Sequence, residues 1–114
     1  MKSLVPLHDI ESVEAAIAES RERPVLLFKH SRYCGVSCEA LDELQTHIDA
    51  QTAPTVAYKM VTVQTHRRVS DVVAQRLGIR HETPQAILLR NGKAVWNASH
   101  FRITARQLDQ IVSD

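Results

Sequence analysis

The sequence lacks several features that would assign it to common functional classes. It has no excess of charge, because 14 Lys and Arg residues accompany 13 Asp and Glu residues, which gives no global field suited to nucleic acid or to an anionic membrane. No apolar run approaches the length that spans a bilayer. The segment from Met1 to Leu7 lacks the apolar stretch and cleavage site of a secretory signal, so we expect a cytoplasmic protein. Without repeats, low-complexity stretches or a linker, residues 1–114 are predicted to form one domain.

Cysteine is also scarce, and Cys34 and Cys38 are the only two. A chain of 114 residues with 44% hydrophobic residues can bury a core without disulfide bonds. Two closely spaced cysteines in a cytoplasmic protein indicate redox or metal chemistry more often than a structural disulfide. None of the six histidines stands at a recognisable zinc spacing from them. We therefore predict thiol chemistry with no organic cofactor.

Hydrophobic periodicity predicts alternating helices and strands. The apolar run at 25–28 is typical of a strand buried on both faces. An amphipathic helix with Ile10, Val13 and Ile17 on one face should precede it, and Asn91-Gly92 indicates a short hairpin. The expected helices span about 9–21, 34–49, 69–77 and the residues after Thr104, and the expected strands lie at 4–7, 56–63, 86–89 and 94–96. Strand–helix–strand connections imply parallel pairing, so the sequence predicts an α/β protein with a mixed sheet and helices on both faces.

Cys34 stands where the first buried strand ends and a helix begins. The free N–H groups and the positive dipole end of a helix favour thiolate over thiol. Lys29, His30 and Arg32 should make this setting electropositive. Cys34 is therefore the candidate nucleophile, and the alternative is a small buried cysteine without a role.

Three other features have two interpretations each. Cys38 is either a second reactive thiol or part of the core, and an i, i+4 disulfide with Cys34 is near the upper limit of disulfide geometry. His30 either stabilises a thiolate when protonated or serves a structural hydrogen bond, which we favour. Arg80 and His81 form either a solvated basic cluster or a site that attracts an anionic thiol.

Four segments resemble the YtxJ-like monothiol bacilliredoxin family. They are Phe-Lys-His-Ser at 28–31, Cys-Gly-Val-Ser at 34–37, His-Glu-Thr-Pro-Gln at 81–85, and the stretch at 91–100. The resemblance implies a thioredoxin-like fold in which Thr83-Pro84 is a cis bond whose loop lies against Cys34. It also implies removal of bacillithiol, a small thiol carrying glucosamine and malate, from mixed disulfides on client proteins. The substrate-binding residues on this interpretation are Tyr33, Gly35, Val36, Thr83 and Pro84.

The chain departs from the family's usual Cys-Pro-Ile-Ser site, because Gly35 replaces the proline and Cys38 is an added thiol. Cys-Gly-Val-Ser is also similar to the Cys-Gly-Phe-Ser site of monothiol glutaredoxins, which can share an iron–sulfur cluster, although the Gly-Gly turn of those proteins is replaced at 97–100. Copper-delivery proteins of thioredoxin fold use Cys-x-x-x-Cys with a distant histidine, and soft thiolates suit Cu(I). The leading hypothesis is a thiol–disulfide oxidoreductase with Cys34 and Cys38 as catalytic residues. The alternative is a metal or iron–sulfur carrier that uses the same two thiols.

Overall fold

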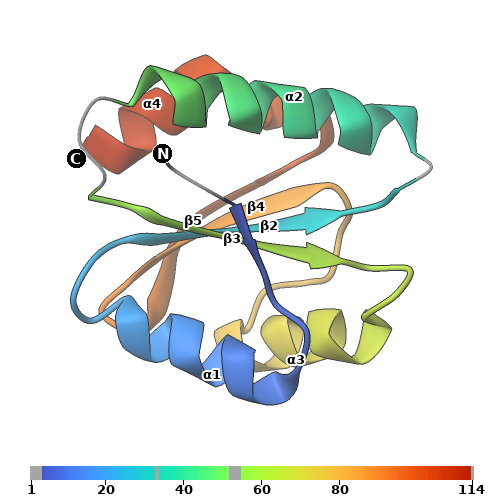
Figure 1. Cartoon of the computed structure of the whole chain (residues 1–114), viewed down its shortest axis with the longest axis vertical. Helices are drawn as coiled ribbons and strands as arrows, with labels where there is room; N and C mark the ends of the chain where they lie inside the picture. Colours follow the sequence, from blue (N-terminus) through green and yellow to red (C-terminus); the bar gives the residue numbers. More distant parts are fainter. Residues whose placement is uncertain (1–3, 33, 52–54, 114) are drawn as a thin grey trace.

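The computed structural model describes residues 4–32, 34–51 and 55–113, whose strands form one mixed sheet (Figure 1). The five strands, in the spatial order β1-β3-β2-β4-β5, are β1 (Leu4–Pro6), β2 (Val25–His30), β3 (Ala57–Thr62), β4 (Gln85–Arg90) and β5 (Lys93–Ser99). β1 and β2 pair with β3 in parallel, whereas β4 is antiparallel to β2 and β5 is antiparallel to β4. The mixed sheet predicted from the sequence is confirmed.

Helices cover both faces of this sheet. They are α1 (Ile10–Glu19), α2 (Gly35–Ala50), α3 (Arg67–Leu77) and α4 (Ala105–Ser113), with a short 3-10 helix, η1 (His100–Arg102), between β5 and α4. α2 and α4 lie on one face, and α1 and α3 lie on the other (Figure 1). Among the helices of the described residues, none has the length and apolar character needed to cross a membrane.

The central strand β2 divides the core into two layers. All six of its residues are buried, and their side chains alternate between the faces as strand geometry requires. Leu26 and Phe28 join the cluster beneath α2 and α4, whereas Val25 and Leu27 join the cluster above α1 and α3. The apolar run predicted at 25–28 is therefore a strand buried on both faces, and it continues through Lys29 and His30.

The predicted turns have the backbone that their residues favour. Asn91 and Gly92 have φ values of 54° and 79°, which fits the two left-handed positions of a tight hairpin turn. Gly78 ends α3 with φ 64°, as expected of a left-handed helix cap. Asp9 caps α1 through a capping box with Ser12.

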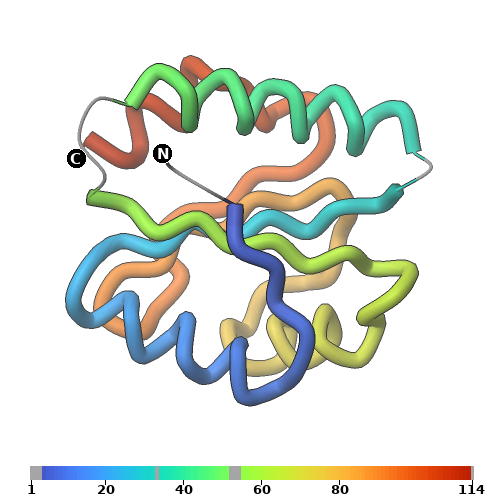
Figure 2. Tube along the Cα trace, viewed as in Figure 1, coloured from blue at the N-terminus to red at the C-terminus, as the bar shows by residue number. Residues whose placement is uncertain are grey.

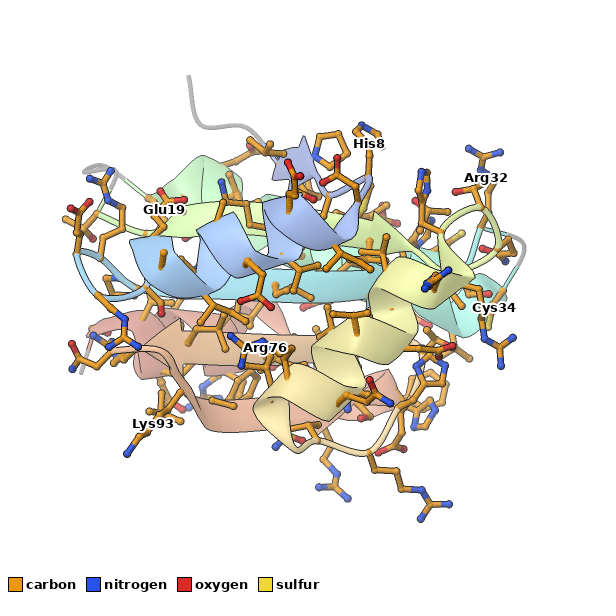
Figure 3. All side chains as sticks on the ribbon, turned by 90° about the horizontal axis from the view of Figure 1, so that it is seen from below. His8, Glu19, Arg32, Cys34, Arg76 and Lys93 are labelled. Carbon is orange, nitrogen blue, oxygen red and sulfur yellow. The ribbon has the colours of Figure 1, made fainter. Side chains whose placement is uncertain are left out.

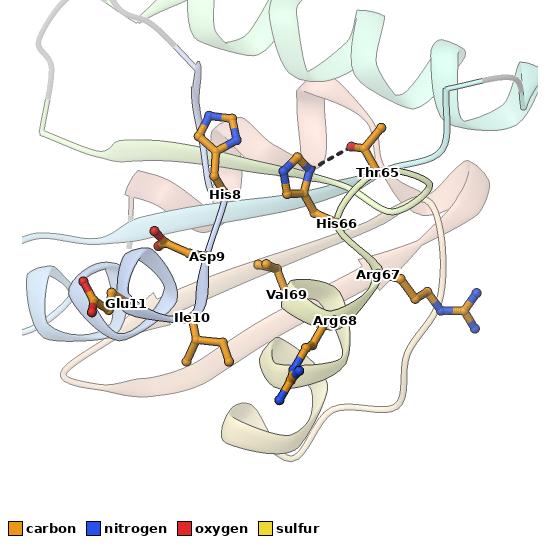
Figure 4. Close-up of a pocket in the computed structure, with 9 residues that line it drawn as sticks. All are labelled: His8, Asp9, Ile10, Glu11, Thr65, His66, Arg67, Arg68 and Val69. Carbon is orange, nitrogen blue, oxygen red and sulfur yellow. Dashed lines mark hydrogen bonds between the residues drawn. The ribbon is translucent and has the colours of Figure 1, made fainter.

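The apolar face predicted for α1 is buried only in part, because Ile10 is 40% exposed. Ile10 is the first residue of α1 and is not among the buried residues of that helix. It lines a surface hollow of about 570 Å³ between the N-terminal ends of α1 and α3, where Val69 is its apolar neighbour (Figure 4). The buried face of α1 is formed by Val13, Ala16 and Ile17.

Three strand ends meet at one end of the sheet. Lys29, near the C-terminal end of β2, pairs with Gln85 at the start of β4, and Gln85 pairs with Ser99 at the end of β5. The chain enters α2 directly after β2 and reaches η1 directly after β5 (Figure 2). Residues just after 30, just before 85 and just after 99 are thus brought together although they are far apart in the sequence.

Candidate active site

Cys34 occupies the N-cap position of α2, as the sequence predicted. Its backbone is extended, with φ −102° and ψ 121°, and its N–H group donates to the Ser31 carbonyl at 3.3 Å. Its own carbonyl accepts the first helical hydrogen bond, from the Cys38 N–H group at 3.0 Å. The side chain is half-buried and the thiol is free. Figure 3 shows Cys34 and Arg32 at the end of the molecule where β2 leads into α2, opposite Glu19 and Lys93.

Ser37 holds the turn before Cys34 in place. Its side chain is fully buried, and its Oγ accepts from the Ser31 N–H group at 2.8 Å and lies 2.8 Å from His30 Nδ1. Gln64, between β3 and α3, fastens the same turn from outside: its Nε2 donates to Ser31 Oγ at 2.8 Å, and its Oε1 accepts from the Arg32 N–H group at 3.0 Å. Sequence reasoning missed Gln64, because no local pattern marks a side chain that bonds to a turn 32 residues away.

His30 serves structure and is not a charged partner of the thiol. Burial, and then the positive charge of Arg32, lowers the pKa of His30 below its usual value, so the neutral imidazole is favoured near pH 7. Its ring stacks on Phe28 with centroids 6.0 Å apart, and its Nδ1 is engaged with Ser37. The favoured structural interpretation agrees with these contacts, although the partner is a hydroxyl and not the backbone.

Lys29 does not contribute to an electropositive setting at Cys34 in the way that the sequence suggested. As a neighbour of His30 on a strand, it points to the opposite face, where its side chain is fully buried. Its Nζ donates to His81 Nδ1 at 3.1 Å, and Ser70 Oγ lies 3.3 Å from the same nitrogen. Burial lowers the pKa of Lys29 to about 8, and the Asp71 carboxylate offsets part of this effect.

His81 is also unsuited to the anion-attracting role considered for it. Its pKa is lowered first by burial and then by the charges of Lys29 and Arg67, so the neutral ring accepts from Lys29 just before the Thr83-Pro84 loop. Only Arg80 of that basic pair is exposed. Gln85, the cross-strand partner of Lys29, donates from Nε2 to the Arg80 carbonyl at 3.0 Å and so fixes the same loop.

Cys38 is exposed, which contradicts its interpretation as part of the core. The buried stripe of α2 is formed by Ser37, Ala40, Leu44, His47 and Ile48. At 100° per residue, Cys38 lies about 100° from Ser37 and about 200° from Ala40, so it faces outward. Its Sγ lies 3.7 Å from the Arg32 carbonyl oxygen, and the thiol is free. The second cysteine is therefore accessible, one helical turn beyond Cys34.

The Thr83-Pro84 bond is cis, as predicted. Pro84 is buried and Thr83 is half-buried at the start of β4. The Pro84 carbonyl accepts from the His100 N–H group at 3.0 Å, which connects this loop to η1. The packing of the loop against Cys34 stays a prediction. Tyr33, another predicted substrate-binding residue, lies outside the described residues.

Comparison with known proteins identifies the family. A family model described as monothiol bacilliredoxin BrxC matches residues 5–108. The chain belongs to the monothiol bacilliredoxin family. One solved structure, described as an oxidoreductase with a thioredoxin fold, is 31% identical to this bacilliredoxin and has a TM-score of 0.83. The match covers 94% of this chain and 91% of the other chain.

Two thioredoxins show the same fold at lower identity. Thioredoxin from Malassezia sympodialis is 16% identical, with a TM-score of 0.73 and coverage of 99% of this chain and 90% of that one. Chloroplastic thioredoxin z is 19% identical, with a TM-score of 0.75 and coverage of 99% and 93%. The thioredoxin-like fold predicted from the sequence is confirmed. Family and fold together support the assignment of this bacilliredoxin to the thiol oxidoreductases as a general class.

The two departures of this bacilliredoxin from the usual site have different surroundings. A Cβ added at Gly35 would meet nothing within 4 Å, so the space beside Cys34 is open. The added thiol of Cys38 has no group of metal ligands around it: within the described residues, no three His, Cys, Asp or Glu side chains are placed to hold a metal ion.

Proposed function

We propose that this bacilliredoxin removes bacillithiol from mixed disulfides on proteins, with Cys34 as the nucleophile. The observation that supports this most is the placement of Cys34 as the half-buried N-cap of α2. At that position the unpaired N–H groups of the first helical turn favour the thiolate, which is the attacking species. A reducing cytoplasm would suit two free thiols, and it is the location we propose.

The first step exchanges one disulfide for another. The Cys34 thiolate attacks the bacillithiol sulfur of the mixed disulfide, an S–S bond forms between Cys34 and bacillithiol, and the client S–S bond breaks. The client sulfur leaves as a thiolate and takes a proton from water. The rate depends on the thiolate fraction at Cys34 and on the acidity of the leaving thiol.

The second step has two routes that conserve electrons. A second bacillithiol thiolate attacks the bound bacillithiol sulfur and releases bacillithiol disulfide and the Cys34 thiolate. Alternatively, the Cys38 thiolate attacks Cys34 Sγ and releases bacillithiol, leaving a Cys34–Cys38 disulfide that an external thiol then reduces. Ser37 stands where dithiol thioredoxins carry their resolving cysteine, and its hydroxyl is buried and bonded, so Cys38 is the internal thiol available. The i, i+4 geometry is marginal for a disulfide, so we expect this route to be slow.

The residues around Cys34 suggest how the substrate is admitted. Gly35 leaves open space beside the thiol, and Val36 is half-buried on the rim of a hollow against η1. Thr83 and Pro84 are proposed to contact the substrate on the other side, where the loop before β4 lies at the same end of the sheet as Cys34. Tyr33 is kept as a proposed contact on sequence grounds alone.

The two cysteine variants test this mechanism as a matched pair. The parent, Cys34→Ser and Cys38→Ser are each treated with bacillithiol disulfide, and the adducts are followed by mass spectrometry over time. We expect Cys34→Ser to form no bacillithiol adduct at the active site. Cys38→Ser should form the Cys34 adduct as fast as the parent and keep it longer.

Two outcomes would contradict this assignment. An adduct on Cys38 but not on Cys34 would reverse the two roles. Absence of any adduct in the parent, under conditions where iodoacetamide still modifies Cys34, would remove bacillithiol as the substrate. Equal adduct lifetimes in the parent and Cys38→Ser would show that release depends on a second bacillithiol only.

A further inference from the structure

Phe101 is a large apolar side chain held out into solvent next to the active site. It is 70% exposed, whereas Ile103, two residues on, is 2% exposed and anchors the segment in the core. The backbone is fixed on both sides: the His100 N–H group donates to the Pro84 carbonyl at 3.0 Å, and the Ile103 N–H group donates to the His100 carbonyl at 3.2 Å. His100 also has a left-handed backbone with φ 56°, which costs energy for a residue other than glycine. The exposure of Phe101 therefore follows from a backbone that hydrogen bonds fix on both sides of this residue.

Two hollows share Phe101 in their lining, and each extends to residues next to the candidate site. One has a volume of about 300 Å³ and is lined by Glu82, next to the Thr83-Pro84 loop, and by Asn97, Ser99 and Arg102. The other has a volume of about 140 Å³ and extends to Val36, two residues after Cys34. Phe101 and His100 line both hollows. A molecule whose sulfur is bonded to Cys34 could thus extend across the Phe101 ring.

We propose that Phe101 and Arg102 form the subsite for the glucosamine and malate parts of bacillithiol. The inference rests on the proposed function and specifies how its substrate is recognised. An aromatic ring offers a flat apolar surface to the C–H face of a sugar. Asn97 and Ser99 supply side chains able to bond to hydroxyl groups, and the Arg102 guanidinium can pair with the malate carboxylates.

The polarity of the larger hollow favours a small polar thiol over an apolar peptide, whereas the smaller hollow carries the carboxylates of Glu39 and Glu43. Apart from Phe101 and Ala98, the larger hollow is lined by polar or charged side chains, namely Glu82, Asn97, Ser99, His100 and Arg102. Arg102 is exposed, and no ion pair between described residues involves it. Glu82 lies 3.9 Å from His100 Nδ1, so its carboxylate is directed toward the imidazole within the same hollow. The cation available to a dicarboxylate ligand is therefore Arg102.

Two disulfides, one with and one without the sugar and carboxylate groups of bacillithiol, can test this subsite. Rates of Cys34 adduct formation are measured by quenched-flow mass spectrometry with bacillithiol disulfide and with 2-hydroxyethyl disulfide, which has neither sugar nor carboxylate. The variants are Phe101→Ala, Arg102→Gln and, as a matched control, Val95→Ala, which removes another exposed apolar side chain (54% exposed) that lines neither hollow. Thermal unfolding checks that all variants are folded.

We expect Phe101→Ala and Arg102→Gln to lower the second-order rate with bacillithiol disulfide by about five- to tenfold each. The rate with 2-hydroxyethyl disulfide should be unchanged in both, and Val95→Ala should match the parent with both substrates. The loss in Arg102→Gln should shrink as salt is raised, because salt screens an exposed ion pair.

The other outcomes separate this inference from the proposed function. If the parent reacts with bacillithiol disulfide and both variants match it, the subsite is refuted while the proposed function stands. If both variants slow the two disulfides equally, they act on Cys34 and not on ligand recognition, and the subsite is again refuted. If the parent itself does not react with bacillithiol disulfide, the proposed function fails.

Discussion

Replacing the buried lysine of β2 should change how the stability of this bacilliredoxin depends on pH. Lys29 is fully buried on the α1 and α3 face, with His81 Nδ1 as the acceptor of its ammonium group. Burial lowers its pKa from 10.5 to about 8. Lys29→Met keeps an unbranched side chain of similar length and removes the titrating group.

The sign and size of the effect follow from proton binding in the two states. Between about pH 8 and pH 10.5 the unfolded chain holds the Lys29 proton while the folded chain has lost it. The unfolded state therefore binds more protons, and the free energy of unfolding rises with pH across this window. Because one pKa unit corresponds to about 1.4 kcal/mol, the full rise attributable to Lys29 is about 3 kcal/mol.

Urea denaturation followed by circular dichroism at several pH values between 7 and 10.5, with a reductant present, measures this directly. The quantity of interest is the difference between the parent and Lys29→Met, since other titrating groups, including Tyr58 with its pKa raised to about 12, are common to both. We expect this difference to shift in favour of the parent by about 3 kcal/mol as the pH rises. Lys59→Met is the control, because it removes a partly exposed lysine whose Nζ lies 3.1 Å from Glu19 Oε1.

Parallel stability curves for the parent and Lys29→Met would refute the reasoning. They would mean that the ammonium group of Lys29 is as well solvated in the folded protein as in the unfolded chain. A drift of equal size in Lys59→Met would show that the effect is a general consequence of removing a positive charge and does not depend on burial.

Three further predictions concern the turn at the proposed nucleophile, Cys34. Gly35→Pro should raise the free energy of unfolding by about 0.5–1 kcal/mol in urea titrations. Gly35 is the first residue of α2 and has open space around it, and Cys34 before it has the extended backbone that a following proline requires. A loss of stability would contradict this prediction. Ser37→Ala should lower the free energy of unfolding by about 1–3 kcal/mol, because it leaves the Ser31 N–H group without its acceptor; unchanged stability would show that water replaces the hydroxyl. In the Cys38→Ser variant, iodoacetamide should alkylate Cys34 faster than a free cysteine peptide at about pH 6.5, and equal rates would count against a thiolate-favouring site.

The parts of the fold that the sequence predicted are those determined by local pattern. A short uninterrupted apolar run favours a strand buried on both faces, and 25–28 forms one. Asn91-Gly92 specifies its turn through backbone preference alone. The N-cap position of Cys34 followed from the boundary between this strand and the amphipathic segment after it, so the candidate nucleophile could be placed before any tertiary contact was known.

The wrong predictions concern which way a side chain points when tertiary packing decides. Cys38 is within three residues of Leu41, but the buried stripe of α2 runs through Ala40 and Leu44, so Cys38 faces outward. Lys29 was expected to make the setting of Cys34 electropositive, yet its side chain is fully buried on the other face of the central strand. Phe101 went unnoticed because an exposed aromatic after a hairpin carries no sequence signal.

The arrangement of strand ends has a consequence for when the chain acquires its chemistry during folding. The candidate site draws on residues after β2, before β4 and after β5, and register between Lys29, Gln85 and Ser99 brings these segments together. These contacts span more than half of the sequence, and contacts between distant residues form late and slowly. A nascent or truncated chain that ends before β5 would contain Cys34 but would lack η1, with its Phe101 and Arg102 side chains. Selectivity for one small thiol, as distinct from bare thiol reactivity, would thus be the last property to appear as the protein folds.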